Sequence, residues 1–99
     1  MIRVRISDEA LEDLSEGYRF YETKEPGLGE YFYSHLRADI EGLKVTGGIH
    51  RIAHRNLHRL ISKTFPWAVL YTQSEQGVTV VAVIDCRRDP KWIRKHLER

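Results

Sequence analysis

The chain has 99 residues, of which 41% are hydrophobic and 30% are charged, and these proportions fit one folded domain. The composition is too apolar for a disordered chain, and no run approaches the ~20 apolar residues that cross a bilayer. The single cysteine, Cys86, excludes an intrachain disulfide and a thiolate metal cage. We therefore expect one soluble domain over residues 1–99, without a membrane segment and located in the cytoplasm, where thiols stay reduced.

The net charge of +2 hides an uneven distribution of charge along the chain. Residues 1–49 contain six Lys or Arg and ten Asp or Glu, whereas residues 50–99 contain ten Lys or Arg and four Asp or Glu. A basic half is typical of a surface that meets phosphates or acidic protein. It is equally typical of a solvated face that binds nothing, so the charge pattern leaves both interpretations open.

The first half of the chain predicts a short strand followed by two helices. Apolar residues alternate with arginines over residues 2–6, which is the period of a strand with one buried face. Ser7 then offers an N-cap oxygen, and apolar residues recur at helical spacing until Pro26 stops the helix. A turn at residues 26–29 leads into a second helix, which residues 46–48 end. Two helices joined so closely form a hairpin.

The second half of the chain predicts three strands and a short helix. The polar, histidine-rich stretch 49–57 is interpreted as a loop that leads into a strand over residues 59–64. A further strand covers residues 67–71, and the valine-rich run 78–84 predicts a central strand covered on both faces. Asp89 and Pro90 mark the start of a helix. The expected order is β-α-α-β-β-β-α, an α+β fold in which the helix hairpin packs on a small, mostly antiparallel four-stranded sheet.

Three segments of the chain resemble the RelE/ParE toxin superfamily, and together they span nearly its whole length. They are Pro26-Gly27-Leu28-Gly29 with Phe32, then Phe65-Pro66-Trp67-Ala68-Val69 with Tyr71, and then Arg87-Arg88-Asp89-Pro90 with Trp92. Each segment alone occurs by chance, so the resemblance rests on their order and spacing on the predicted elements. Within the superfamily, the helix break and the Arg-Asp-Pro segment are most similar to the ParE-like, plasmid-stabilisation branch.

This resemblance implies a RelE/ParE-like fold and a toxin of a type II toxin–antitoxin system. Such a toxin is held silent in a hetero-oligomer by a cognate antitoxin, which typically joins a ribbon-helix-helix or similar DNA-binding domain to a disordered tail. The implied target is DNA gyrase for ParE-like members and messenger RNA in the ribosome for RelE-like members. No cofactor is implied. A member that has lost toxicity and acts only as a binding partner is a third alternative.

A RelE-like, metal-independent endoribonuclease needs cations at the scissile phosphate and an acid–base group near the 2′-hydroxyl. The cationic candidates are Arg59, Lys63 and Arg88, which are also explained as charges that keep a sheet edge soluble. His96 is the remaining acid–base candidate, because no tyrosine follows Tyr71. A histidine in a regular helix is more often a surface residue than a catalyst. The missing tyrosine therefore favours the non-enzymatic, gyrase-binding alternative.

Two further sets of residues are predicted to contact partners. Arg87, Arg88 and Trp92 are expected to meet the target. An apolar groove along the helix hairpin is expected to take the antitoxin, and its candidate residues are Leu14, Tyr18, Tyr21, Phe32, Leu36 and Trp67. By their periodicity, the aromatic residues in this set are equally explained as core residues.

The histidines and the cysteine are further candidates for metal binding or catalysis. His50, His54 and His58 recur every four residues, a spacing that can hold a transition metal. No carboxylate lies between residues 42 and 74 to complete such a site, so we predict no metal. Cys86 directly follows an apolar strand, and we interpret it as a small packing residue rather than a nucleophile.

Overall fold

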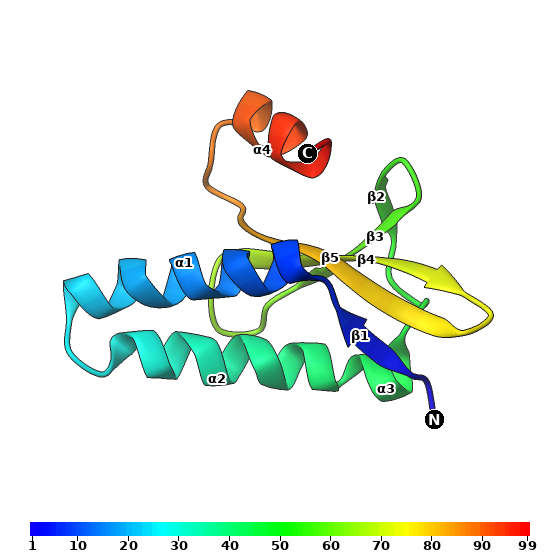
Figure 1. The fold of residues 1–99 in the computed structure, drawn as a ribbon, viewed down its shortest axis with the longest axis horizontal. Coiled ribbons are helices and arrows are strands. Elements are labelled where there is room, and N and C mark those ends of the chain that lie inside the picture. The colour runs from blue at the N-terminus through cyan, green and yellow to red at the C-terminus, as the bar shows by residue number, and fades with distance from the viewer.

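The computed structural model describes residues 1–99 and is built around a five-stranded sheet in the order β1-β5-β4-β3-β2 (Figure 1). Its strands are β1 (Val4–Ile6), β2 (Ile52–His54), β3 (Leu57–Ile61), β4 (Trp67–Ser74) and β5 (Gly77–Asp85). The helices are α1 (Asp8–Lys24), α2 (Leu28–Glu41), the single turn α3 (Leu43–Thr46) and α4 (Pro90–Leu97). Only β1 and β5 pair in parallel, so the expected α+β fold with a mostly antiparallel sheet is confirmed.

The sheet has one strand more than the sequence pattern predicts. The stretch 49–57 was expected to be a loop, but residues 52–54 form β2, which turns at Arg55 and Asn56 into β3. Arg55 adopts a left-handed backbone with φ 50°. Because β2 is an edge strand with its first two residues exposed, it does not need the apolar alternation that reveals a half-buried strand.

The third strand also begins and ends earlier than predicted. The sequence predicts a strand over residues 59–64, whereas β3 starts at Leu57 and ends at Ile61. Directly after it, the Ser62 hydroxyl accepts hydrogen bonds from the backbone N–H groups of Thr64 and Phe65, both at 3.2 Å. This side chain turns the backbone away from the sheet, and the residues that follow lie outside the strand.

Local signals set the ends of the helix hairpin, as the sequence predicts. The Ser7 hydroxyl caps α1 by accepting a hydrogen bond from Ala10 N at 3.1 Å. After α1, Gly27 takes a left-handed conformation with φ 92°, and the Glu22 carboxylate accepts from the N–H groups of Gly27 and Gly29. These contacts join α1 to α2 through a short turn, and the two helices run antiparallel (Figure 1).

Helices cover both faces of the sheet. The hairpin α1–α2 packs on one face around a large core, whose fully buried side chains include Leu14, Phe32, Leu36, Ile40, Val69, Tyr71 and Val80. On the opposite face, α4 lies over a smaller core of Leu57, Ala68, Leu70, Ala82 and Ile84. Strand β5 contributes to both cores, as its valine-rich sequence predicts.

The final helix is attached differently from the other long helices. None of the residues of α4 is buried, although Trp92, Ile93 and Leu97 pack partly against the smaller core. Figure 1 shows α4 standing apart from the hairpin, joined to β5 by an extended segment. Asp89 caps α4 by accepting from Lys91 N at 2.8 Å, and Pro90 occupies its first turn, as predicted. No helix in the structure is long and apolar enough to span a bilayer.

Candidate functional site

A groove of about 320 Å³ lies between α4 and the sheet face that α4 covers. Its floor is apolar and includes Leu70 and Ile84, while Ile93 and Leu97 of α4 form one wall. The remaining lining residues are Ala53, His54, Arg59, Cys86, Arg88, Pro90 and Arg94. The groove therefore combines an apolar base with cationic side chains, and we call it the α4 groove.

Three elements bring the arginines of the α4 groove together. Arg59 lies on β3 opposite Leu70 of β4, so the two side chains share the face of the sheet that α4 covers. Arg88 follows the end of β5, and Arg94 lies on α4. Arg59 and Arg88 are both candidate site residues predicted from the sequence, and both line this groove. Arg94 was not proposed, because helical periodicity alone does not reveal which side of a short, exposed helix faces the sheet.

The three groove arginines have no acidic partner. None of them takes part in an ion pair, and no Asp or Glu lines the groove. The guanidinium of Arg88 lies 4.0 Å from the centroid of the Trp92 ring, a stacking contact that holds it without neutralising its charge. The groove therefore carries a surplus of positive charge, which the carboxylate of Asp85 offsets only in part at Arg88.

Arg87, the neighbour of Arg88, differs from it because its side chain is bound to a carboxylate. Its Nε and Nη2 donate to the two carboxylate oxygens of Asp85 at 2.9 and 2.8 Å, and Nη2 also lies 3.3 Å from the Tyr21 hydroxyl. Burial alone would raise the pKa of Asp85, but the hydrogen bonds and charge of Arg87 and the charge of Arg88 hold it below its ordinary value. The side chain of Arg87 is thus occupied within the fold, whereas that of Arg88 is free to meet a ligand.

His54 is a groove residue that sequence reasoning missed. It ends β2, and its Nε2 is buried without a hydrogen-bond partner, while the nearest carboxylate oxygen, on Glu98, is 3.9 Å away. The only sequence signal was the regular spacing of three histidines, which does not distinguish His54 from the other two. Because β2 was expected to be a loop, the face on which His54 lies could not be predicted.

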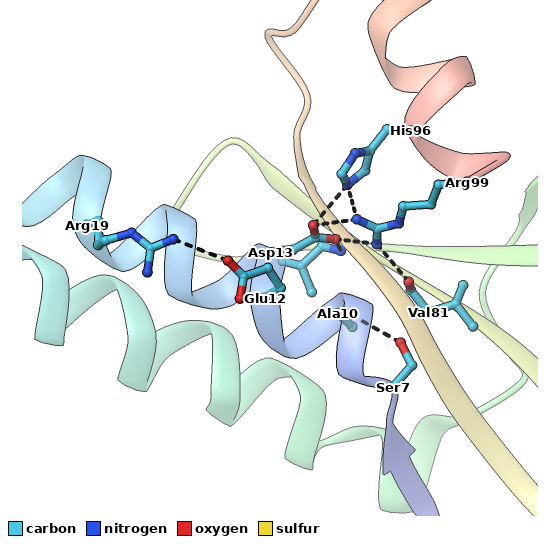
Figure 2. Close-up of polar contacts among 9 residues, drawn as sticks. Ser7, Ala10, Glu12, Asp13, Arg19, Val81, His96 and Arg99 are labelled. Atoms are coloured by element: carbon cyan, nitrogen blue, oxygen red, sulfur yellow. Dashed lines mark hydrogen bonds and ion pairs between the residues drawn. The ribbon is translucent and has the colours of Figure 1, made fainter.

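The other two ribonuclease candidates lie outside the α4 groove. Lys63 is exposed beyond the end of β3 and does not line the groove. His96 lies against α1, where its Nε2 is 2.9 Å from Oδ1 of Asp13 (Figure 2). Its ring stacks on Trp92 with the centroids 4.5 Å apart. The four candidates therefore do not form one cluster, because β3 ends early and His96 faces α1.

Asp13 is the centre of a second polar cluster, which Figure 2 shows in full. Its side chain is only 4% exposed, and its Oδ2 accepts from Val83 N at 2.9 Å. Arg99 donates to both carboxylate oxygens, at 2.9 and 2.8 Å, and its Nη2 also donates to the Val81 carbonyl at 3.1 Å. The hydrogen bond to Asp13 raises the pKa of Arg99. We call the contacts of Asp13 with His96 and Arg99 the C-terminal clamp.

The C-terminal clamp explains how a helix without buried residues stays over the sheet. It joins the chain end to α1 and to β5, where the register shifts beside Val81. At the same end of α4, Glu98 contacts Arg55 in the β2–β3 turn at 3.4 Å. The sequence contains a signal that Asp13 is buried, since it lies at helical spacing with the buried residues Ala10 and Gly17.

The residues expected to form an antitoxin groove are mostly core residues. Leu14, Phe32 and Leu36 are fully buried, and the indole N–H of Trp67 donates to the Tyr21 hydroxyl at 3.0 Å inside the core. Of the expected set, Tyr18 is the most accessible. The prediction of an open groove lined by the whole set is therefore corrected: these apolar side chains pack between the hairpin and the sheet. The exposed apolar side chains of the hairpin are instead Leu11, Phe20 and Tyr31.

The three regularly spaced histidines do not share one site. His50 and His58 both contact Tyr71, the first through a 2.6 Å contact of its Nδ1 with the hydroxyl and the second by stacking at 5.0 Å. Burial, followed by the nearby His58, lowers the pKa of His50. His54 instead lines the α4 groove. No group of three or more His, Cys, Asp or Glu side chains is arranged to hold a metal ion.

Comparison with known proteins identifies the fold. No protein-family model and no curated protein sequence matches the chain. Among solved structures, a chain of the chromosomal ParDE toxin–antitoxin system of P. aeruginosa matches with a TM-score of 0.78 and 11% identity, over 86% of this chain and 96% of that one. The isolated RelE toxin of E. coli matches with a TM-score of 0.60 and 12% identity, over 96% of this chain and 95% of the toxin. The chain therefore has the RelE/ParE fold, as its sequence motifs predict.

Proposed function

We propose that this chain is the toxin of a type II toxin–antitoxin pair and that it inhibits DNA gyrase, as its ParE-like motifs imply. The observation that supports gyrase rather than messenger RNA as the target is the hydrogen bonding of His96. A ribonuclease of the RelE kind would need an acid–base group near the C-terminus, and the only candidate there is bound to Asp13 in the C-terminal clamp. The higher TM-score with the ParDE chain than with RelE points in the same direction.

The surface that we propose to meet gyrase is formed by α4 and the connection that precedes it. Arg88 stacks on Trp92 and lines two hollows of the molecule, the α4 groove and a smaller cleft of about 150 Å³ beside α1, whose lining also includes Trp92. Arginine and tryptophan are the residue types most often found at the energetic centre of protein interfaces. Arg87, predicted alongside them, supports this surface by fixing its backbone to Asp85.

A purified system tests this function. Supercoiled plasmid, gyrase and the chain are incubated together, and the reaction is stopped with denaturant before electrophoresis. We expect linear DNA to accumulate in proportion to the added chain, because a poisoned gyrase leaves its cleaved DNA trapped. Absence of both linear DNA and inhibition of supercoiling at saturating concentrations of the chain would refute the proposal.

A cognate antitoxin is the second part of the proposal. An antitoxin with a ribbon-helix-helix or similar domain and a disordered tail would bind the chain in the cytoplasm and keep it inactive in a hetero-oligomer. Inducing the chain alone in a bacterial host should reduce the number of viable cells, and co-expression with the product of the adjacent reading frame should restore it. Unchanged viability on induction alone would favour a non-toxic binding protein.

A ribosome-dependent endoribonuclease is the second candidate function, and the position of His54 favours it. The α4 groove holds His54 beside Arg59 and Arg88, a combination that could bind a phosphate and exchange a proton with the 2′-hydroxyl. Transcript mapping after induction would then reveal cuts within translated codons, and His54→Asn should abolish them. Intact messages would eliminate this candidate.

A further inference from the structure

We infer that the α4 groove binds the sugar–phosphate backbone of duplex DNA, so that the chain contacts the DNA held by gyrase as well as the enzyme. This inference rests on the proposed function and assigns a ligand to its groove. The ligand is recognised by charge, and the side chains that recognise it are Arg59, Arg88 and Arg94. Because these contacts involve phosphates, binding is expected to be largely independent of base sequence.

The α4 groove gathers positive charge from three arginines that form no ion pair, and the nearby carboxylates are Asp85, which attracts Arg88 without a direct contact, and Glu98 beside His54. Its three arginines come from β3, from the segment after β5 and from α4, and none has an acidic partner. Elsewhere in the molecule, Arg19, Arg55, Arg87 and Arg99 are paired with carboxylates, whereas Arg3, Arg5, Arg37 and Arg51 form no ion pair. The groove is distinguished because it brings three arginines without ion pairs around one hollow. Like charges held around one groove repel each other, so a polyanion that binds across all three relieves this repulsion.

The α4 groove is also partly organised before a ligand binds. Arg88 is held against the Trp92 ring at 4.0 Å, and the bidentate contact between Arg87 and Asp85 fixes the backbone next to it. The C-terminal clamp at Asp13 anchors α4, on which Arg94 lies. Side chains that already point at the ligand lose less conformational entropy on binding.

The donor groups of the α4 groove suit the oxygens of a phosphate. A guanidinium has a planar set of N–H donors that matches two oxygens of a phosphate, and arginine is therefore a common residue for binding nucleic acids. His54 also lines the groove, but its Nε2 is buried, so the donors that a ligand can reach are the three exposed guanidinium groups. Carboxylates of an acidic protein could also pair with guanidinium groups, so acidic polypeptide is included below as a competitor.

Fluorescence anisotropy with a labelled short DNA duplex tests the inference on the full chain without gyrase. The logarithm of the binding constant is measured against the logarithm of salt concentration, since the slope counts the phosphates that are neutralised. We expect each of the variants Arg59→Gln, Arg88→Gln and Arg94→Gln to weaken binding and to reduce the slope by about 1. Lys24→Gln is the matched control, because it removes one charge at the far end of α1 and should leave the slope unchanged.

Three outcomes would overturn the inference. The groove variants could keep the wild-type slope, the duplex could fail to bind at low salt, or single-stranded RNA or polyglutamate of matched charge could compete more strongly than unlabelled duplex. The test is separable from that of the proposed function. Trapped gyrase cleavage together with absent DNA binding would overturn only this inference, whereas groove-dependent DNA binding without any effect on gyrase would support the groove and refute the proposed function.

Discussion

Asp13, in the first half of the chain, binds the C-terminal residue Arg99 through both of its carboxylate oxygens, at 2.9 and 2.8 Å. The same carboxylate accepts from the backbone of Val83 in β5. One buried acidic side chain thus connects α1, strand β5 and the end of α4. Because α4 forms one wall of the α4 groove, the position of that wall depends on a contact between residues 86 positions apart in the sequence.

Replacing Asp13 should destabilise the protein strongly. Asp13→Ala would leave the Val83 N–H and the Arg99 guanidinium without their acceptor, and we expect the free energy of unfolding in urea to fall by about 2–4 kcal/mol. Glu12→Ala is the matched control, because its ion pair with Arg19 is largely exposed and should contribute less than about 1 kcal/mol. Equal losses in the two variants would contradict the structural role assigned to Asp13.

Removing the other partner of the clamp should loosen α4 selectively. In Arg99→Ala, we expect the backbone amides of α4 to exchange with deuterium faster, since α4 has no buried residue to hold it. The amides of α2 should exchange as they do in the wild type. Lys95→Ala removes an exposed charge from the same helix and should leave both rates unchanged. Uniform acceleration across the chain in Arg99→Ala would instead indicate global destabilisation.

The partial burial of His50 should make stability depend on pH. Burial and then the neighbouring His58 lower the pKa of His50, so below its unfolded value of about 6.5 the unfolded state binds more protons than the folded state. The contribution of His50 to the free energy of unfolding should therefore be fully present above that pH and should be lost on acidification. We expect unfolding free energies measured between pH 7 and about pH 5 to decline less in His50→Gln than in the wild type. An unchanged pH profile would contradict this prediction.

Close packing at Gly17 predicts a further loss of stability. A Cβ atom at this position would lie 2.5 Å from the ring of Phe32 and 3.0 Å from that of Trp67, so Gly17→Ala must displace core side chains. We expect destabilisation by about 1–3 kcal/mol, even though alanine favours a helix more than glycine does. Glu16→Ala, at the exposed neighbouring position, should be close to neutral. A stabilised Gly17→Ala variant would contradict this prediction and show that Phe32 and Trp67 can move without loss of stability.

The parts of the fold that the sequence predicts correctly are those with local causes. Ser7 and Asp89 cap their helices through residues only two or three positions away, and the valine-rich β5 shows its burial in its own composition. The hairpin turn at residues 26–29 is equally local. These features could be predicted because glycine, proline and cap residues act on their immediate neighbours.

The features that the sequence does not predict depend on pairing across the fold. The edge strand β2 has neither alternation nor an apolar face, so its sequence predicts a loop. For that reason, the sequence does not predict on which face of the sheet His54 lies. The C-terminal clamp needs Asp13 and Arg99 to meet through tertiary structure. The core residues expected at an antitoxin surface illustrate the same limit, because periodicity identifies the apolar face of a helix and does not say whether the sheet or a partner covers it.

The most direct test of the central claim compares DNA and RNA from one culture after induction of the chain. If the chain poisons gyrase, chromosomal DNA should carry double-strand breaks at gyrase-binding sites while messenger RNA stays intact, and a host with gyrase depleted should show no breaks. Intact chromosomes together with messages cut inside translated codons would contradict the claim and support the ribonuclease candidate instead.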